Sequence, residues 1–186
     1  MAYPFYTIGH GTRPLDEFVG LLRGVEVTLL GDVRTVPRSR TNPQFNRETL
    51  PDALRPFGVA YEHMASLGGL RSRVHDVPTT VNDFWTNESF HNYADYAMGD
   101  LFRAGLAHLR HLGQTQRCAI MCAETVWWRC HRRIITDYLL AANEQVFHIL
   151  AAEKIERAVI NEAARPKRTD LLVYPAEPSA QSDLFA

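Results

Sequence analysis

The chain has 186 residues, of which 46% are hydrophobic and 22% are charged, and its formal net charge is -1. This is the composition of an ordinary globular protein, which argues against a disordered chain and against a globally basic nucleic-acid binder. No run approaches the roughly 18 consecutive apolar residues of a membrane span, and the N-terminus lacks a signal-peptide pattern. Three cysteines, an odd number, argue against a disulfide framework. We therefore expect a cytoplasmic protein.

The first half of the chain alternates between strand-like and helix-like segments. An aromatic and β-branched run over 3–8 predicts a buried strand that ends at His10, between two glycines. Apolar spacing predicts a helix from Leu15 to a stop at Gly24. A second strand over 25–33, a loop over 35–46, a short helix over 47–57 and a third strand over 59–63 follow.

Polar side chains also follow the second predicted strand. Asp32 and Arg34 stand at its end, and the loop that follows carries Arg38 and Arg40. Three arginines near a strand end suit an anion-binding loop, although a solvated surface loop explains them equally well. Further along, Gly68-Gly69 precedes Arg71, and this pair more often marks a turn than a ligand contact.

The second half continues the alternation. An aromatic-rich helical region spans 82–112, and most of its aromatic residues are expected in the core. A strand over 118–121, a helix from 130, a strand over 146–150 and a helix over 153–164 complete the order. This order predicts an α/β fold with a mostly parallel sheet of about five strands and helices on both faces. We expect one domain over 1–166 and a C-terminal tail over 167–186.

The segment from Arg117 to Leu140 concentrates reactive side chains where a strand gives way to a helix. Ligand sites of α/β sheets favour such places. Cys118 and Cys122 lie four residues apart on the strand, roughly 13 Å, too far for a disulfide. Cys118 is therefore expected in the core and Cys122 at the strand end, close enough along the chain to meet Cys130 across the turn.

Three kinds of chemistry fit this segment. A phosphatase-like or rhodanese-like cysteine loop is disfavoured because Glu124 would repel phosphate, and because six residues separate Cys122 from Arg129. A metal site is weakly indicated, since no paired CxxC or HxxxH spacing is present. Acid–base catalysis by Glu124 and earlier strand-end groups, with arginines holding an anionic substrate, is slightly favoured and needs no cofactor.

These considerations define the candidate residues. The candidate catalytic residues are His10, Asp32, Cys122, Glu124 and His131, with His10 and Glu124 as acid–base groups and Cys122 as a potential nucleophile. His131 is equally well explained as a core histidine. The candidate substrate-binding residues are Arg34, Arg38, Tyr61, Arg71 and Arg132. No cofactor is predicted, and if a metal binds, its ligands are Cys122, Cys130 and His131.

Several motifs together resemble the family catalogued as domain of unknown function 488. They are Thr7-Ile8-Gly9-His10, Asp32-Val33-Arg34 with Pro37 and Ser39, Leu67-Gly68-Gly69 with Arg71, Met121-Cys122-Ala123-Glu124, and Cys130-His131-Arg132. The chain departs from the family pattern at Thr12, where a serine often follows the histidine directly, and at Trp127-Trp128. The resemblance implies an α/β fold and a shared site, but no particular reaction.

The extreme C-terminus carries a separate motif. Gln181-Ser182-Asp183-Leu184-Phe185 is similar to the pentapeptide by which bacterial DNA polymerases and repair proteins dock on the sliding clamp. In that mode Leu184 and Phe185 enter an apolar pocket while Gln181 binds at its rim. A tail that folds back on its own domain is the alternative.

Three functional hypotheses follow. The first is an enzyme that acts on nucleic acid or a nucleotide in DNA repair or metabolism and that is recruited to the sliding clamp by its tail. The second is a non-catalytic DNA-associated module with a structural cysteine cluster. The third is a cysteine- or metal-dependent enzyme of rhodanese-like or hydrolase type. No membrane partner is expected.

Overall fold

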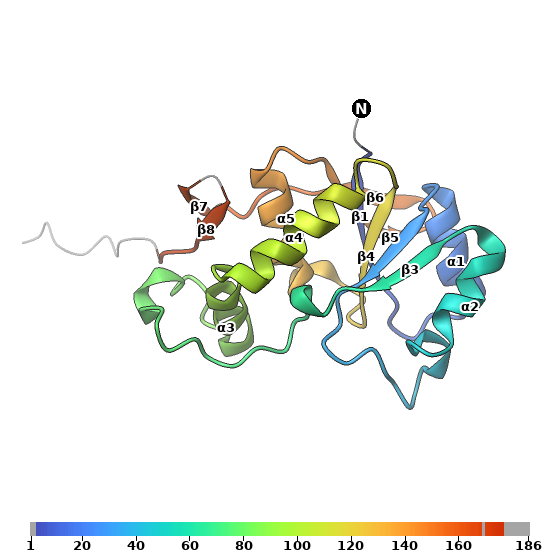
Figure 1. Ribbon diagram of the computed structural model, residues 1–186, viewed down its shortest axis with the longest axis horizontal. Coiled ribbons are helices and arrows are strands. Elements are labelled where there is room, and N and C mark those ends of the chain that lie inside the picture. Colours follow the sequence, from blue (N-terminus) through green and yellow to red (C-terminus); the bar gives the residue numbers. More distant parts are fainter. Residues whose placement is uncertain (1–2, 169, 177–186) are drawn as a thin grey trace, which may run out of the picture.

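A computed structural model describes residues 3–168 and 170–176 (Figure 1). The strands are β1 (Phe5–Gly9), β2 (Leu29–Asp32), β3 (Ala60–His63), β4 (Cys118–Cys122), β5 (Val146–Ala151), β6 (Lys154–Arg157), β7 (Arg165–Arg168) and β8 (Leu171–Val173). The α-helices are α1 (Leu15–Gly24), α2 (Leu50–Leu54), α3 (Glu88–Ala97), α4 (Asp100–Leu112) and α5 (Arg132–Ala141). In the described part of the chain, no helix is long and apolar enough to cross a membrane.

Six strands form one sheet in the order β3-β2-β4-β1-β5-β6. The first five are parallel, and only β6 runs antiparallel to its neighbour. In Figure 1, α1 and α2 lie on one side of this sheet, and α4 and α5 lie on the other. The α/β fold with a mostly parallel sheet is therefore confirmed, with one strand more than the five expected.

The extra strand replaces the helix predicted over 153–164, and that prediction is wrong. The chain turns back directly after β5, so that Lys154 pairs with Ala151 and Glu156 with His148. Ile155, Val159 and Ile160 resemble one stripe of a helix in the sequence, yet their side chains are 41%, 77% and 39% exposed. Pairing with the otherwise open edge of β5 satisfies backbone groups that a helix would have left unpaired, so tertiary context overrides local pattern.

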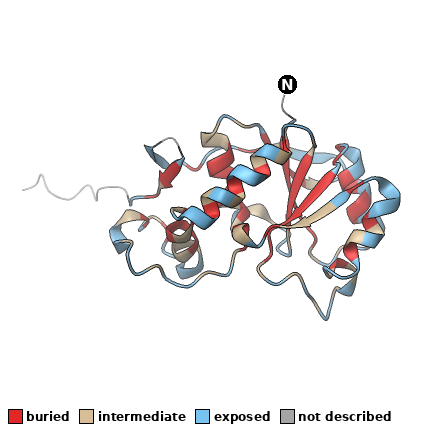
Figure 2. Cartoon of the chain, in the orientation of Figure 1, coloured by how far each residue is buried: buried red, intermediate tan, exposed pale blue. Residues whose placement is uncertain are grey.

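Two hydrophobic cores lie on opposite faces of the sheet, because side chains alternate along each strand. On β4, Cys118 and Ile120 face the core under α3, α4 and α5, whereas Ala119 and Met121 face the core under α1 and α2. Buried residues are concentrated in the strands of the sheet and along one side of α4 (Figure 2). Cys118 is therefore a core residue, as predicted.

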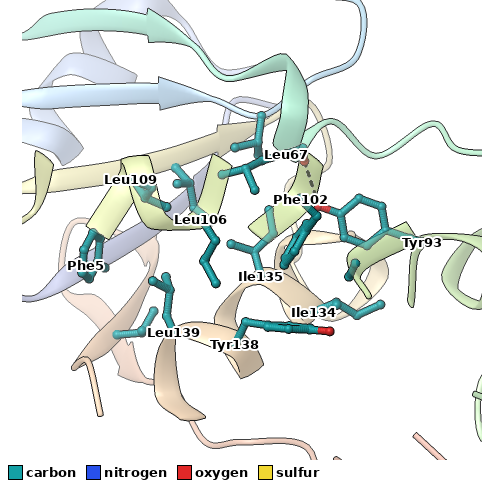
Figure 3. Close-up of a cluster of buried hydrophobic side chains, with 14 of the residues drawn as sticks. Phe5, Leu67, Tyr93, Phe102, Leu106, Leu109, Ile134, Ile135, Tyr138 and Leu139 are labelled. Atoms are coloured by element: carbon teal, nitrogen blue, oxygen red, sulfur yellow. Dashed lines mark hydrogen bonds between the residues drawn. The ribbon is translucent and has the colours of Figure 1, made fainter. Parts of the chain in front are cut away.

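The predicted helical region over 82–112 is two helices, because the chain breaks at Met98-Gly99 between α3 and α4. Its aromatic residues do pack in the core, where Tyr93 of α3 meets Phe102 of α4 edge to face with ring centroids 6.0 Å apart. The Tyr93 hydroxyl donates a hydrogen bond to the Leu67 carbonyl oxygen at 2.8 Å (Figure 3). This bond ties α3 to the loop that follows β3.

The folded unit continues past the domain boundary expected at residue 166. β7 and β8 form a separate two-stranded ribbon. Beyond it the Tyr174 side chain is fully buried, and its hydroxyl donates to Asp137 at 3.0 Å. The Tyr174 backbone N–H also donates to the side chain of Asn82. The clamp-like residues Gln181, Leu184 and Phe185 lie outside the described residues.

Candidate functional site

The candidate site lies along the carboxyl-end edge of the sheet. β2, β4 and β1 are neighbours, with Asp32 beside Met121 and Gly9 beside Cys122 in register. Because parallel strands end at the same edge, the polar groups predicted at each strand end come together. Alternation along the strands, however, separates them into two clusters with different environments.

The first group is the ion-pair cluster of His10, Asp32, Arg34 and Tyr61. Arg34 and Asp32 form a bidentate ion pair, with Nε to Oδ1 at 2.9 Å and Nη2 to Oδ2 at 2.6 Å. The Tyr61 hydroxyl donates to the same Asp32 Oδ2 at 2.7 Å. Asp32 is fully buried and Arg34 is 6% exposed. Close, bidentate hydrogen bonds are therefore needed to offset the cost of removing both charges from water.

His10 completes this cluster with both ring nitrogens occupied. Its Nδ1 donates to the Gly11 carbonyl oxygen at 2.9 Å, which leaves Nε2 to accept from Arg34 Nη1 at 3.2 Å. The ring stacks on Phe45 with centroids 4.4 Å apart. Burial lowers the pKa of His10 to about 4, and the Arg34 charge adds to that shift. The imidazole is therefore neutral near pH 7.

The second group is the thiol–imidazole cluster of Cys122, Cys130 and His131, on the other face of the sheet. Cys122 ends β4, and the loop after it returns Cys130 and His131 at the start of α5. Their two sulfur atoms and one ring nitrogen all lie within 4.8 Å of one another. This confirms that Cys122 and Cys130 meet across the turn, and it places His131 at the site rather than in the core alone.

The two thiols of this cluster are not equivalent. Hydrogen bonding to Cys130 and burial raise the pKa of Cys122 well above its ordinary range. Burial would also raise the pKa of Cys130, but the hydrogen bond from Cys122 and the neighbouring His131 and Arg132 lower it well below that range. The Arg132 Nε donates directly to Cys130 Sγ at 3.3 Å. This hydrogen bond from Arg132 favours the thiolate form of Cys130.

The His131 ring is held in one orientation. Its Nε2 donates to the Val33 carbonyl oxygen at 2.8 Å, so the Nδ1 lone pair faces Cys130 Sγ at 3.5 Å. Gly69 packs on the ring: a Cβ there would lie 2.3 Å from Nδ1 and 2.7 Å from both Cγ and Cε1. These distances put the Cβ above the face of the ring, which only glycine permits.

The thiol–imidazole cluster opens onto a cavity of about 570 Å³. Glu124 lies at this cavity with an exposed side chain, and its backbone oxygen accepts a hydrogen bond from Arg132. Arg34 also reaches the cavity from the ion-pair cluster. The lining residues are Arg34, Thr35, Val36, Gly69, Leu70, Asn87, Ser89, Phe90, Cys122, Ala123, Glu124, Trp128, Arg129, Cys130 and His131.

The other sequence-predicted residues are placed elsewhere. Arg71 donates to the Gly68 and Ala65 carbonyl oxygens and stacks over Tyr96 at 3.8 Å, so it fastens the loop after β3. Tyr61 is committed to Asp32. Arg132 is buried beneath the cavity as the partner of Cys130, and Arg38 is exposed on the loop after β2. None of these four side chains lines the cavity.

Phe90, Trp128 and Arg129 line the cavity but are not among the site residues predicted from the sequence. Trp128 is 46% exposed, which is unusual for a large aromatic side chain. Trp127 instead packs inward and stacks on His148 with centroids 4.2 Å apart. The occurrence of two tryptophans in a polar turn could have indicated from the sequence that Trp128 and Arg129 belong to the site. No sequence pattern indicated that Phe90 belongs to the site, because it lies far from the other site residues along the chain.

The fold and these two clusters define an α/β protein with a thiol–imidazole centre at the carboxyl edge of its parallel sheet. The chain belongs to the family described as Domain of unknown function DUF488, whose model matches residues 14–139. The matched segment includes the whole thiol–imidazole cluster, Glu124 and the Asp32–Arg34 pair. No curated protein and no solved structure matches the chain.

Proposed function

We propose that this protein is a hydrolase that acts on a nucleotide or nucleic-acid substrate in the cavity above the thiol–imidazole cluster. The observation that carries the proposal is the convergence of Cys122, Cys130 and His131 within 4.8 Å at a cavity that Glu124 also lines. Nucleophilic and proton-transferring groups gathered in one concave site are the usual form of a catalytic centre.

Glu124 is the proposed general base. Its carboxylate is exposed and enters no hydrogen bond or ion pair with the part of the chain that the structure describes. A free carboxylate at the cavity can take a proton from an attacking water molecule, whereas the carboxylate of Asp32 is already bound to Arg34 and Tyr61. His10 and Asp32 are positioning residues in this proposal.

The cavity lining supports an aromatic, anionic substrate. Phe90 and Trp128 offer ring surfaces on which a nucleobase can stack, and the exposed Arg129 offers a cation for phosphate. Arg34 uses four of its five N–H donors on Asp32, Phe45 and His10, which leaves one donor for a ligand.

The test is turnover by the Glu124→Gln variant. Purified protein is incubated with nucleotides and short single-stranded oligonucleotides, and products are separated by chromatography. Loss of a general base lowers kcat by about 100- to 10,000-fold. Because the Glu124 side chain is exposed, Tm should stay unchanged.

Glu153→Gln is the matched control, since Glu153 is an exposed glutamate in the turn between β5 and β6. It should retain full turnover. Absence of turnover by the wild-type protein with every substrate would contradict the proposal and favour a non-catalytic module. Equal turnover by wild type and Glu124→Gln would contradict the role of Glu124 as general base.

A second proposal concerns recruitment: the C-terminal Gln181-Ser182-Asp183-Leu184-Phe185 docks on the DNA sliding clamp in the cytoplasm and brings the site to DNA under repair. Its support is the sequence motif, together with three free cysteines that suit a reducing compartment. Binding to purified clamp should disappear when residues 180–186 are deleted. Unchanged binding, or none by the intact chain, refutes it.

A further inference from the structure

The thiol–imidazole cluster has the chemistry of a metal site. Two cysteine sulfurs and one histidine nitrogen are ligands that select thiophilic, borderline cations, and zinc is the commonest of these in proteins. Among the described residues, this is the group of three or more potential ligands whose donor atoms converge. We propose that Cys122, Cys130 and His131 bind one Zn²⁺ ion, with the fourth coordination position open to the cavity.

The spacing of the donor atoms fits this ion. Tetrahedral zinc with ordinary Zn–S and Zn–N bonds separates a sulfur and a nitrogen ligand by about 3.5 Å, and two sulfurs by about 3.8 Å. Cys130 Sγ and His131 Nδ1 are 3.5 Å apart, and all three donors lie within 4.8 Å. Small side-chain rotations therefore suffice to close the three donors on an ion.

The surroundings of the ligands have the form of an outer shell. Metal-bound histidines commonly donate their second ring N–H to a carbonyl or carboxylate, which fixes the coordinating nitrogen. His131 Nε2 donates to the Val33 carbonyl oxygen in this way and leaves Nδ1 for the ion. Arg132 Nε donates to Cys130 Sγ, an arrangement that favours the thiolate a metal requires.

The open position gives the site a catalytic rather than a purely structural form. Structural zinc sites are usually closed by four protein ligands, whereas catalytic sites keep three and leave one position for water. All three proposed ligands line the cavity, together with the free carboxylate of Glu124. Metal binding by these residues does not depend on the proposed function. The use of the metal as a Lewis acid that activates water does rest on that function.

The experiment measures metal binding directly. The full-length protein, free of any affinity tag, is reduced, stripped with a chelator and titrated with Co²⁺, which is then displaced by Zn²⁺. We expect one Co²⁺ per chain, with thiolate charge-transfer absorption and the visible bands of tetrahedral cobalt. X-ray absorption of the zinc form should show two sulfur neighbours at about 2.3 Å.

Three alanine variants supply the matched comparison. Cys122→Ala and Cys130→Ala should weaken binding by at least about 100-fold, since loss of an outer-shell partner alone weakens it by about 10- to 100-fold. Cys118→Ala should bind as the wild type does, because Cys118 lies on the same face of β4 but in the core. Circular dichroism of the metal-free variants verifies that each one folds.

The outcomes separate the two proposals. No thiolate charge-transfer band, or equal binding by the Cys118, Cys122 and Cys130 variants, overturns the zinc site. Nucleotide turnover by metal-free protein that still requires Glu124 would overturn the use of the metal in catalysis, while leaving the hydrolase proposal intact. Stoichiometric binding that requires Cys122 and Cys130, without any turnover, would establish the zinc site and contradict the proposed function.

Discussion

The two clusters at the carboxyl edge of the sheet differ in how far they open onto the cavity. In the ion-pair cluster, both Asp32 oxygens and both nitrogens of His10 have partners in the protein. In the thiol–imidazole cluster, Cys122, Cys130 and His131 face one another and a cavity. Neighbouring strand ends thus serve two purposes. The buried hydrogen bonds of the first cluster make it a rigid support, and the cavity leaves the second cluster accessible to a ligand.

Breaking the ion-pair cluster should have the largest effect. Asp32→Asn leaves the Arg34 charge buried without its partner, which should lower the free energy of unfolding by about 3–5 kcal/mol in urea denaturation. Asp52→Asn is the control, because the Asp52–Arg55 pair is 71% and 77% exposed and should contribute less than about 1 kcal/mol. Similar effects of the two changes would show that the cluster is not a support.

Acid should also weaken the support, because His10 must stay neutral to accept from Arg34. Burial lowers the pKa of His10 from 6.5, the ordinary value of a histidine, to about 4 in the folded chain. Burial lowers the pKa of His148 by the same amount. As pH falls from 6.5 to 4, the unfolded chain takes up protons that the folded chain does not. The free energy of unfolding should then fall by up to about 1.4 kcal/mol per pH unit for each histidine.

One group acts in the opposite direction. Burial raises the pKa of Asp137 from 3.8 to about 6, so this carboxyl takes up its proton more readily when folded and gains stability as pH falls through that window. The destabilisation from the two histidines exceeds the stabilisation from the one aspartate. Urea denaturation at a series of pH values should therefore show a net fall in the free energy of unfolding between pH 6.5 and 4. His148→Gln should flatten the curve, and a flat curve in the wild type would contradict the neutral buried imidazoles.

A smaller change should disturb the thiol–imidazole cluster alone. Gly69→Ala puts a methyl group against the face of the His131 ring, which should cost about 1–3 kcal/mol of unfolding free energy and weaken Co²⁺ binding. Gly20→Ala is the control, since a Cβ on that helical glycine meets nothing within 4 Å and should stabilise α1 by about 0.5–1 kcal/mol. Unchanged cobalt binding by Gly69→Ala would show that ring orientation is unimportant.

The smallest expected effect distinguishes two exposed arginines. Arg129 lines the cavity and Arg38 does not. Arg129→Ala should raise the KM for a nucleotide roughly tenfold, the equivalent of about 1.4 kcal/mol for one charged hydrogen bond, whereas Arg38→Ala should leave it unchanged. Steady-state kinetics decides, and an equal rise for both variants would place the substrate outside the cavity.

Periodicity and strand order predicted that the strand ends would meet, because parallel strands share a carboxyl edge. Cys122, Glu124, Cys130 and His131 could be predicted in this way. Their separation from His10 and Asp32 could not be predicted, since the face of the sheet to which a strand-end residue points depends on where each strand stops and on its register. Arg71 was misplaced because its contacts with Ala65, Gly68 and Tyr96 come from loop geometry that no periodic pattern encodes.

The anchoring of the C-terminal segment has a consequence for recruitment. The Ala176 backbone N–H donates to the Asp83 side chain at 2.6 Å, and the Phe84 backbone N–H donates to the Tyr174 carbonyl oxygen. Asp83 and Phe84 lie a few residues before Asn87, which lines the cavity. Gln181 follows Ala176 by five residues, a reach of at most about 18 Å. Under the proposed recruitment, DNA on the clamp would therefore meet the site at a high effective concentration without any affinity of its own for the cavity.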